Sequence, residues 1–280
     1  MSDRRIIETG TEYLLGWVED GVAVLSFNRP ERRNALHDEM YRGFAMALPV
    51  IAEDSGVGAV VVTGEGGAFC AGGDVKGFAE GHARAAASAA VAPSPAASID
   101  NLRARQAEVS LALHRMPKLT IAALPGAAAG AGLSIALACD LRVATEKAVI
   151  TTAFAKIGAS GDFGGSWFLT QLVGASKAKE LYIMSDRLSA REAEKLGIVN
   201  RVFADDEFAT GWMDYARRIA AGPTLAHRAI KENINRAVGS ELVTCLDAEA
   251  VNMVATMSTA DHREATAAFI EKREAKFIGR

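Results

Sequence analysis

The sequence predicts an α/β fold with a buried sheet, followed by a helical C-terminal region. Short runs rich in β-branched residues, such as residues 57–63, are typical of buried parallel strands. The order strand, strand, helix recurs along residues 1–204, and parallel strands need such crossovers. From 205 to 280 the pattern is helical. With 280 residues, 50% of them hydrophobic, the chain can form one large domain with a helical extension.

The N-terminal elements are predicted from turn chemistry and periodicity. Residues 12–19 and 21–28 form two strands joined at Asp20-Gly21, a residue pair that favours tight hairpin turns. Residues 36–53 carry apolar side chains at helical spacing, and the strand over 57–63 follows.

The middle of the chain alternates between strands and helices. Residues 79–98 are mostly Ala, Ser and Pro, which predicts a mobile loop or a poorly ordered helix. A helix over 103–116, a strand over 120–124, a buried helix over 130–139 and a strand over 141–144 follow.

The C-terminal part, residues 206–276, is predicted to be a series of helices. Breaks are expected near Gly222-Pro223, near Gly239-Ser240 and at Thr259. We therefore predict a boundary near residue 204, between an α/β core over 1–204 and a helical region over 205–280.

Composition excludes several classes of protein. The net charge of −3 gives no basic face for nucleic acid. The three cysteines, at 70, 139 and 245, form no CxxC pair and no ligand pattern with histidines, which argues against a disulfide framework and against a metal site. His37 and His114 lie on predicted helices without an acidic partner in the sequence, so we expect a surface or core role for both.

The sequence shows no targeting or membrane-spanning pattern. The first residues lack a signal-peptide run, and no stretch reaches the roughly 20 apolar residues that cross a bilayer. The apolar stretch 119–139 comes nearest, but Pro125 and several glycines interrupt it. We expect a soluble, cytoplasmic protein without a membrane partner.

Two glycine-rich segments, residues 64–74 and 126–132, each follow a strand and open a helix. The first N–H groups of a helix are unpaired and carry partial positive charge, so two such ends aimed at one point form a pocket for a developing oxyanion. Tight packing of helix against strand is the alternative. A dinucleotide-binding GxGxxG motif is matched only in part, because Phe69 stands where the last glycine belongs.

Together these segments resemble the enoyl-CoA hydratase/isomerase family, also called the crotonase family. The matching stretches are NRPERRNAL (28–36), VVTGEGGAFCAGGD (61–74), KLTIAALPGAAAGAGLSIALACD (118–140), LSAREAEKLGIVNRV (188–202) and FIEKREAKF (269–277). The resemblance implies a spiral of strand-strand-helix repeats with a C-terminal helical trimerisation region, and an assembly of one homotrimer or two. It also implies an acyl-CoA thioester substrate that brings coenzyme A itself, with no separate cofactor.

The resemblance assigns the oxyanion donors and part of the substrate contacts. It places the two donors at the backbone N–H groups of Gly73 and Ala131, which would hold the thioester oxygen. It places the coenzyme A moiety near Arg29 and the first glycine segment, which includes Ala71 and Asp74. Asp74 is expected mainly to fix that loop.

Further contacts are expected from the tail and from the acyl pocket. Lys272 and Phe277 of a neighbouring subunit would assist in binding coenzyme A. Phe154 and Trp167 are expected beside the acyl group.

This sequence departs from the pattern of the family's hydratases, which activate water with two glutamates. Ser134 and Phe154 stand at those two positions, and neither side chain can act as a carboxylate base. Ser134 can hydrogen-bond substrate or water, or it can serve in packing alone.

Asp162 supplies a carboxylate a little further along, at the start of a predicted helix. An apolar pocket would raise its pKa and suit it to proton transfer. Alternatively, the side chain caps the helix, and the helix N-terminus would then lower the pKa.

The leading hypothesis is an acyl-CoA enzyme in which Gly73 and Ala131 stabilise a thioester enolate and Asp162 moves the proton. The missing glutamates favour isomerisation over hydration. The alternatives are an enoyl-CoA hydratase that uses Asp162 and Ser134, a coenzyme A-binding relic without chemistry, and a structural subunit.

Overall fold

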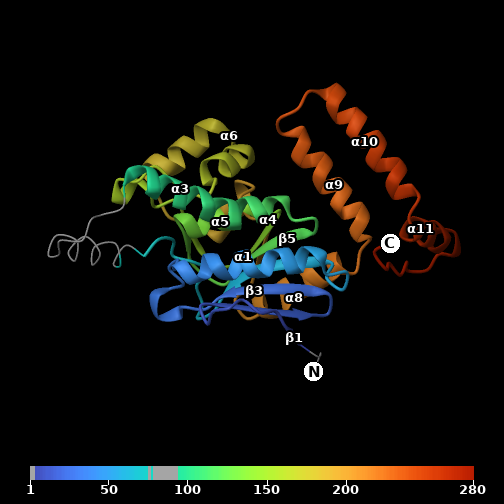
Figure 1. Ribbon diagram of the computed structural model, residues 1–280, viewed down its shortest axis with the longest axis horizontal. Helices are drawn as coiled ribbons and strands as arrows, with labels where there is room; N and C mark the ends of the chain where they lie inside the picture. The colour runs from blue at the N-terminus through green and yellow to red at the C-terminus, as the bar shows by residue number, and fades with distance from the viewer. Residues whose placement is uncertain (1–3, 75–76, 78–93) are drawn as a thin grey trace.

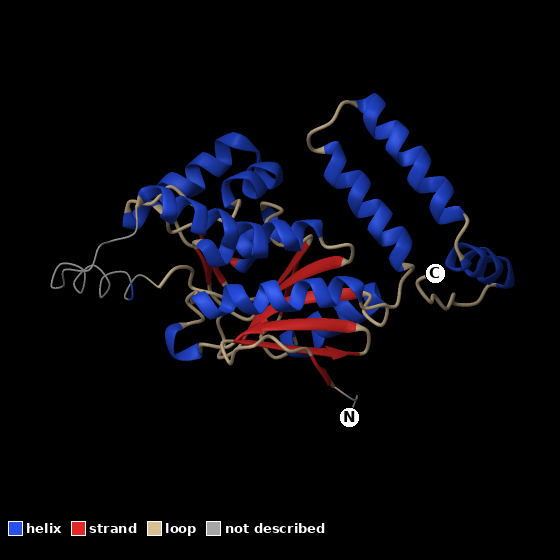
Figure 2. Cartoon of the chain, in the orientation of Figure 1, coloured by secondary structure: helices blue, strands red, loops and turns tan. Residues whose placement is uncertain are grey.

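A computed structural model describes residues 4–74, 77 and 94–280 of the protein. Most of the predicted loop over 79–98 therefore lies outside the described residues. The core is a seven-stranded sheet with the strand order β1-β2-β3-β4-β5-β7-β10 (Figures 1 and 2). Its strands are β1 (Arg5–Ile6), β2 (Leu14–Glu19), β3 (Val22–Phe27), β4 (Ala59–Gly64), β5 (Leu119–Leu124), β7 (Leu141–Thr145) and β10 (Arg201–Phe203). A smaller sheet combines β6 (Ala128–Ala129), β8 (Val149–Thr151) and β9 (Leu188–Ser189).

The large sheet begins antiparallel and continues parallel. The predicted hairpin is confirmed as β2 and β3, which pair antiparallel across Asp20 and Gly21. Both turn residues have positive φ, 51° and 75°, as the favoured two-residue hairpin turn requires. From β3 through β4, β5 and β7 to β10, all neighbours pair parallel, so their carboxyl ends lie at one edge of the sheet.

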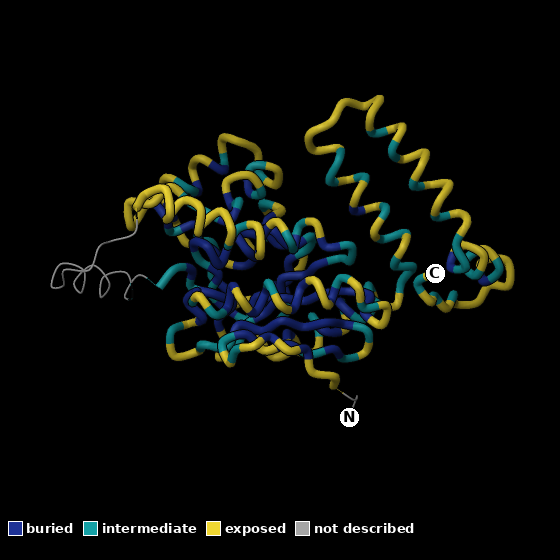
Figure 3. The backbone as a smooth tube through the Cα atoms, viewed as in Figure 1, coloured by how far each residue is buried: buried dark blue, intermediate teal, exposed yellow. Residues whose placement is uncertain are grey.

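Helices cover both faces of this sheet. They are η1 (Pro30–Arg32), α1 (Asp38–Glu53), α3 (Pro95–Gln106), η2 (Ala107–Leu111), α4 (Ala112–Arg115), α5 (Ala131–Ala138), η3 (Ala155–Ile157), α6 (Gly165–Met184), α7 (Ala190–Lys195), α8 (Phe208–Ala220), α9 (Thr224–Ala237), α10 (Leu242–Met257) and α11 (Ala260–Glu271). In the described part of the chain, no helix combines the length and apolar character that a membrane crossing needs. Figure 3 shows the buried segments concentrated in the sheet and the helices on it.

Helix α8 belongs to the core by its packing. Phe208, Met213 and Ala216 of α8 are buried in one cluster with Val61 of β4 and Ile121 of β5. The boundary predicted near residue 204 assigned α8 to the C-terminal helical region. The sequence pattern identifies α8 as a helix, but it does not reveal that this helix packs on one face of the sheet. The helices that extend beyond the sheet begin at α9 (Figure 1).

The helix predicted over 103–116 begins earlier than expected. It starts at Pro95, so the last residues of the stretch 79–98, for which we predicted a mobile loop or a poorly ordered helix, are helical. Ser94 explains the start, because its side chain accepts a hydrogen bond from Ala97 N at 3.2 Å, and Pro95 at the first helical position suits a helix N-terminus. The helix continues through the π-helical turn η2 into α4.

The predicted breaks between the C-terminal helices are confirmed, and a buried lysine ties the first of these helices to the core. Lys231 of α9 is only 7% exposed. Its ammonium donates to Asp140 Oδ2 at 2.7 Å, to the carbonyl of Lys118 at 3.2 Å and to that of Leu113 at 3.4 Å. This set of bonds fixes α9 against the end of α4.

We predict that Lys231→Met lowers the free energy of unfolding by about 3–5 kcal/mol, because it leaves the largely buried Asp140 carboxylate without its cation. Urea unfolding would measure the change. Lys177→Met is the matched control: its exposed pair with Glu180 is worth less than about 1 kcal/mol. Equal losses in the two variants would contradict a structural role for the buried pair.

Candidate active site

The two glycine-rich segments lie side by side at the carboxyl edge of the sheet. They follow β4 and β5, which are neighbouring parallel strands. The amides of Phe69 and Cys70 donate to the carbonyl of Ala127 at 3.0 and 3.1 Å, and Ala129 N donates to the Cys70 carbonyl at 3.0 Å. The backbone itself therefore joins the segments.

Glycines are required where the segments touch. A methyl group on Gly72, whose φ is +87°, would lie 2.7 Å from the carbonyl oxygen of Ala129 and 3.3 Å from Ala131 N. One on Gly132 would lie 2.3 Å from the Cys70 carbonyl oxygen. Any side chain at either position would push the segments apart.

The amides of Gly73 and Ala131 are available as donors at this junction. Ala131 is the first residue of α5, and the helical bonds begin only when Ser134 N donates to the Gly130 carbonyl at 3.0 Å. Within the described residues, neither amide donates to a protein acceptor. Both amides are thus unpaired on adjoining loops, and their role as oxyanion donors stays a prediction.

Cys70 lies between these donors as a packing residue. Its thiol is fully buried, and burial raises its pKa to about 12. It accepts a hydrogen bond from Gly72 N at 3.4 Å. A thiol with this pKa is not a nucleophile at neutral pH.

Asp162 lies at the turn that precedes α6. Gly164, with φ of 75°, is the N-cap residue, and no side chain caps the helix, so the capping role considered for Asp162 is wrong. The backbone carbonyl of Asp162 accepts a hydrogen bond from Gly165 N at 3.1 Å. In the Asp162 side chain, the buried Oδ1 has no hydrogen-bond partner among the described residues. Burial raises the pKa of the carboxyl to about 6, opposite to the lowering that a helix N-terminus would cause.

Three side chains gather beside Asp162 around Gly165. The ring of Tyr182, on α6, stacks on Phe154 with centroids 5.9 Å apart. A methyl group on Gly165 would lie 2.2 Å from Ser134 Oγ and 2.5 Å from the Tyr182 hydroxyl. Sequence reasoning missed Tyr182, because an aromatic residue inside a helix is more often part of the core.

The loop that carries Gly73 is held by an ion pair. Arg29 donates to Asp74 Oδ2 at 2.9 Å, and both side chains are largely buried. The amide of Gly77 and the Arg29 guanidinium lower the pKa of the Asp74 carboxyl. Ala71 N donates to the Arg33 carbonyl at 3.0 Å. These bonds place Arg29, Ala71 and Asp74 together beside the first glycine segment.

The predicted tail residues are not brought to this site within one chain. Lys272 ends α11 and is exposed, and Phe277 lies in the segment that follows. Figure 1 shows α11 at the opposite end of the molecule from α3 and α6. Over residues 4–74, 77 and 94–280, no three metal-ligating side chains gather.

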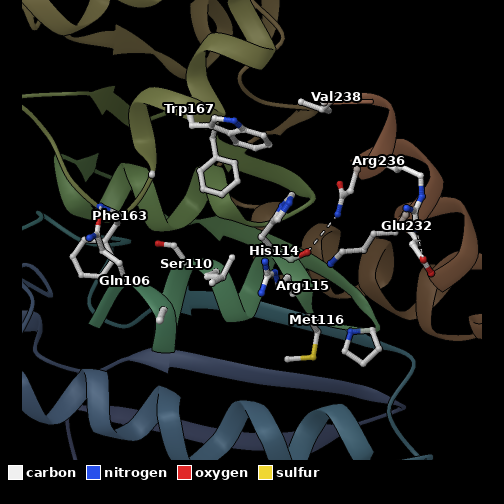
Figure 4. Close-up of a pocket in the computed structure, with 18 of the residues that line it drawn as sticks. Gln106, Ser110, His114, Arg115, Met116, Phe163, Trp167, Glu232, Arg236 and Val238 are labelled. Carbon is white, nitrogen blue, oxygen red and sulfur yellow. Dashed lines mark hydrogen bonds and ion pairs between the residues drawn. The ribbon is translucent and has the colours of Figure 1, made fainter. Parts of the chain in front are cut away.

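A cavity of about 1030 Å³ lies next to Asp162, between the core and α9. Phe163 and Gly164, the two residues after Asp162, line it, and so does Trp167, which was predicted to contact the acyl group. Figure 4 shows Phe163 and Trp167 facing the helix that runs through η2 and α4.

Comparison with known proteins agrees with the fold and with the residue pattern. Residues 18–280 match the model of the family described as enoyl-CoA hydratase/isomerase. The chain is 34% identical to 1,2-epoxyphenylacetyl-CoA isomerase of Escherichia coli (strain K12), over 96% of this chain and 99% of that protein. It is also 34% identical to 4-chlorobenzoyl coenzyme A dehalogenase-1 of Arthrobacter sp., over 90% and 88%. The crystal structure of an enoyl-CoA hydratase from Polaromonas sp. JS666 matches with a TM-score of 0.86 and 32% identity, over 94% and 99%.

The sheet, its helices and these structural neighbours define a crotonase-like α/β fold of the kind that acts on acyl-CoA thioesters. The chain belongs to the enoyl-CoA hydratase/isomerase family, as the sequence predicted. Relatives in this comparison carry the names of an isomerase, a dehalogenase and a hydratase, so the family alone does not specify the reaction.

We predict that Asp162→Asn becomes more stable relative to the native protein as pH rises. The carboxyl pKa is about 6 in the fold against 3.8 for the free side chain, so ionisation disfavours the folded state. The loss of stability caused by this ionisation grows between about pH 4 and pH 6 and is complete at neutral pH. Asparagine does not ionise, so the variant does not lose this stability. Urea unfolding across this range would measure the difference, with exposed Asp206→Asn as control. A stability difference that does not change with pH would contradict the raised pKa.

Proposed function

We propose that this protein catalyses proton transfer beside the thioester carbonyl of an acyl-CoA, as an isomerase rather than a hydratase. The amides of Gly73 and Ala131 hold the carbonyl oxygen, and Asp162 takes up and returns the proton. The observation that carries the proposal is the Asp162 carboxyl, which is half-buried just before the cavity-lining residues Phe163 and Gly164, has an unpaired Oδ1 and has a pKa of about 6.

The proposed chemistry divides between the backbone and one side chain. Removing a proton next to a thioester places negative charge on the carbonyl oxygen, and each preorganised donor there is worth about 2.7–4 kcal/mol in the transition state. A carboxyl with a pKa near the working pH can accept the proton at one carbon and deliver it at another. The same group thus serves as base and then as acid.

The residues around Asp162 support isomerisation. Phe154 is buried and stacked on Tyr182, and Ser134 Oγ donates to the Gly130 carbonyl at 3.3 Å. Neither side chain can deprotonate water in the way that the resemblance expects of the hydratase glutamates. The similarity to an epoxyphenylacetyl-CoA isomerase supports the same reaction class. Hydration is the second candidate, because Ser134 Oγ lies against Gly165, whose amide donates to the Asp162 carbonyl, and a hydroxyl there could orient a water.

We predict that Asp162→Asn lowers turnover of a 3-enoyl-CoA by about 10²–10⁴-fold, because it removes the group that moves the proton. In the native protein the rate should fall below about pH 6, where Asp162 is protonated. Isomerisation of 3-enoyl-CoA and hydration of 2-enoyl-CoA would be assayed side by side, with Asp206→Asn as control. Full activity of Asp162→Asn on both substrates would refute the assignment, and loss on the 2-enoyl substrate alone would favour hydration.

Proton–deuterium exchange at the α-carbon separates an enzyme from a coenzyme A-binding relic. The proposal expects the native protein to exchange the α-proton of a bound acyl-CoA, and expects Asp162→Asn to bind without exchange. Binding by the native protein without exchange would identify the relic.

The C-terminal helices support a proposed homotrimer or pair of trimers, the assembly that the family resemblance implies. Val251 and Val254 on α10 are 69% and 67% exposed, and several other apolar side chains on α9 to α11 are also exposed to solvent. Burying such a surface between subunits is favourable at about 25 cal/mol per Å².

Light scattering should therefore give three or six times the 29.5 kDa of one chain. The double variant Val251→Glu, Val254→Glu should reduce that mass, because it places charges on the apolar surface. Val50→Glu, at an exposed position of α1, is the control. A native mass of one chain would contradict the proposed assembly.

A further inference from the structure

One continuous helix presents a row of polar side chains to the cavity. Gln106 at the end of α3, Ser110 in η2 and His114 in α4 follow one another at intervals of four residues and line the same wall (Figure 4). The turn that carries Ser110 is π-helical. Such turns are rare and occur frequently at functional sites.

Ser110 has an unused hydroxyl at this wall. The residue is 4% exposed, and its Oγ has no hydrogen-bond partner in the described part of the chain. A buried serine in an ordinary helix can bond the carbonyl four residues back, but no such bond forms from this π-helical turn. Gln106 differs, because its Oε1 already accepts from Phe163 N at 2.9 Å. Buried hydroxyls are nearly always paired, so Ser110 indicates a ligand group.

His114 adds a second polar group, surrounded by aromatic rings. Its ring lies 5.6 Å from that of Trp167 and 5.4 Å from that of Phe168. Burial and the nearby charge of Lys231 lower the pKa of the imidazole, so the ring is neutral at pH 7 and offers one donor and one acceptor. Among the described residues, neither ring nitrogen makes a hydrogen bond.

The cavity combines this polar wall with an aromatic one. Phe163 and Trp167 face the row that contains Ser110 and His114, and Phe168 lines the same cavity. Flat aromatic walls favour a ring, and the volume exceeds what a short straight chain would fill. A plain hydrocarbon chain would leave the Ser110 hydroxyl without a partner.

We propose that this cavity holds the acyl group of the substrate, and that this group is a ring bearing a hydroxyl or ketone oxygen, which Ser110 Oγ and the His114 imidazole bind. The inference rests on the proposed function, since it treats the cavity as the continuation of the Asp162 site. It adds a substrate class that neither the family nor the oxyanion donors specify.

Calorimetry with acyl-CoA thioesters tests the inference without turnover. The probes are acetyl-CoA, phenylacetyl-CoA and the 2-, 3- and 4-hydroxyphenylacetyl-CoA isomers. We expect the native protein to bind at least one hydroxylated isomer about tenfold more tightly than phenylacetyl-CoA. Ser110→Ala and His114→Phe should each remove most of that preference and keep the affinity for phenylacetyl-CoA, while exposed Ser55→Ala should change neither.

Unfolding measurements on the variants would show whether a loss of binding comes from a loss of stability. Ser110→Ala removes an unpaired hydroxyl, so its stability should equal or exceed that of the native protein. His114→Phe keeps an aromatic ring against Trp167 and Phe168.

The outcomes separate this inference from the proposed function. If the protein binds acetyl-CoA and exchanges its α-proton but shows no preference for any hydroxylated ring, the inference is overturned and the proposed function stands. An equal preference in the native protein and both variants also overturns it. The expected preference without exchange supports the binding site and overturns the proposed catalysis. No binding of any thioester overturns both.

Discussion

The structure depends on the hydrogen bonds that join the two glycine-rich segments at the carboxyl edge of the sheet. Because Cys70 and Ala127–Ala129 are paired through their backbones, the Gly73 and Ala131 amides are positioned by strand register and not by side chains. The positions of these two amides therefore tolerate wide change in the side chains around them. This separation explains how one fold can accept Ser134, Phe154 and Asp162 where other reactions need other groups.

Asp162 illustrates how position decides the character of a carboxyl group. The side chain lies only two residues before the N-cap of α6, where a helix would favour its ionised form. Its Oδ1 is instead buried with no hydrogen-bond partner among the described residues, and desolvation dominates. A carboxyl that bonds no neighbour can approach a reacting carbon, whereas one engaged in capping could not.

Much of the fold follows from local patterns, and the remainder depends on contacts between distant residues. The hairpin at Asp20-Gly21 and the breaks between the C-terminal helices were predictable because turn chemistry is local. The association of α8 with the sheet was not, since it depends on a face formed by β4 and β5. In the site, motif resemblance indicated Gly73, Ala131 and Asp162. Tyr182 and Ser110 escaped notice because their positions result from the stacking on Phe154 and from a π-helical turn, which no periodicity reveals.

The buried Lys231 has a consequence for the cavity between the core and α9. Its ammonium donates to the Leu113 carbonyl of α4 and to the Asp140 carboxylate of the core, so α9 cannot move away from the core without leaving a charge unpaired. The α9 side of the cavity is consequently fixed before any ligand arrives. A ligand that enters there meets a wall already in place, so little conformational entropy is lost on that side, and the free protein rather than closure around the ligand sets the width of the space.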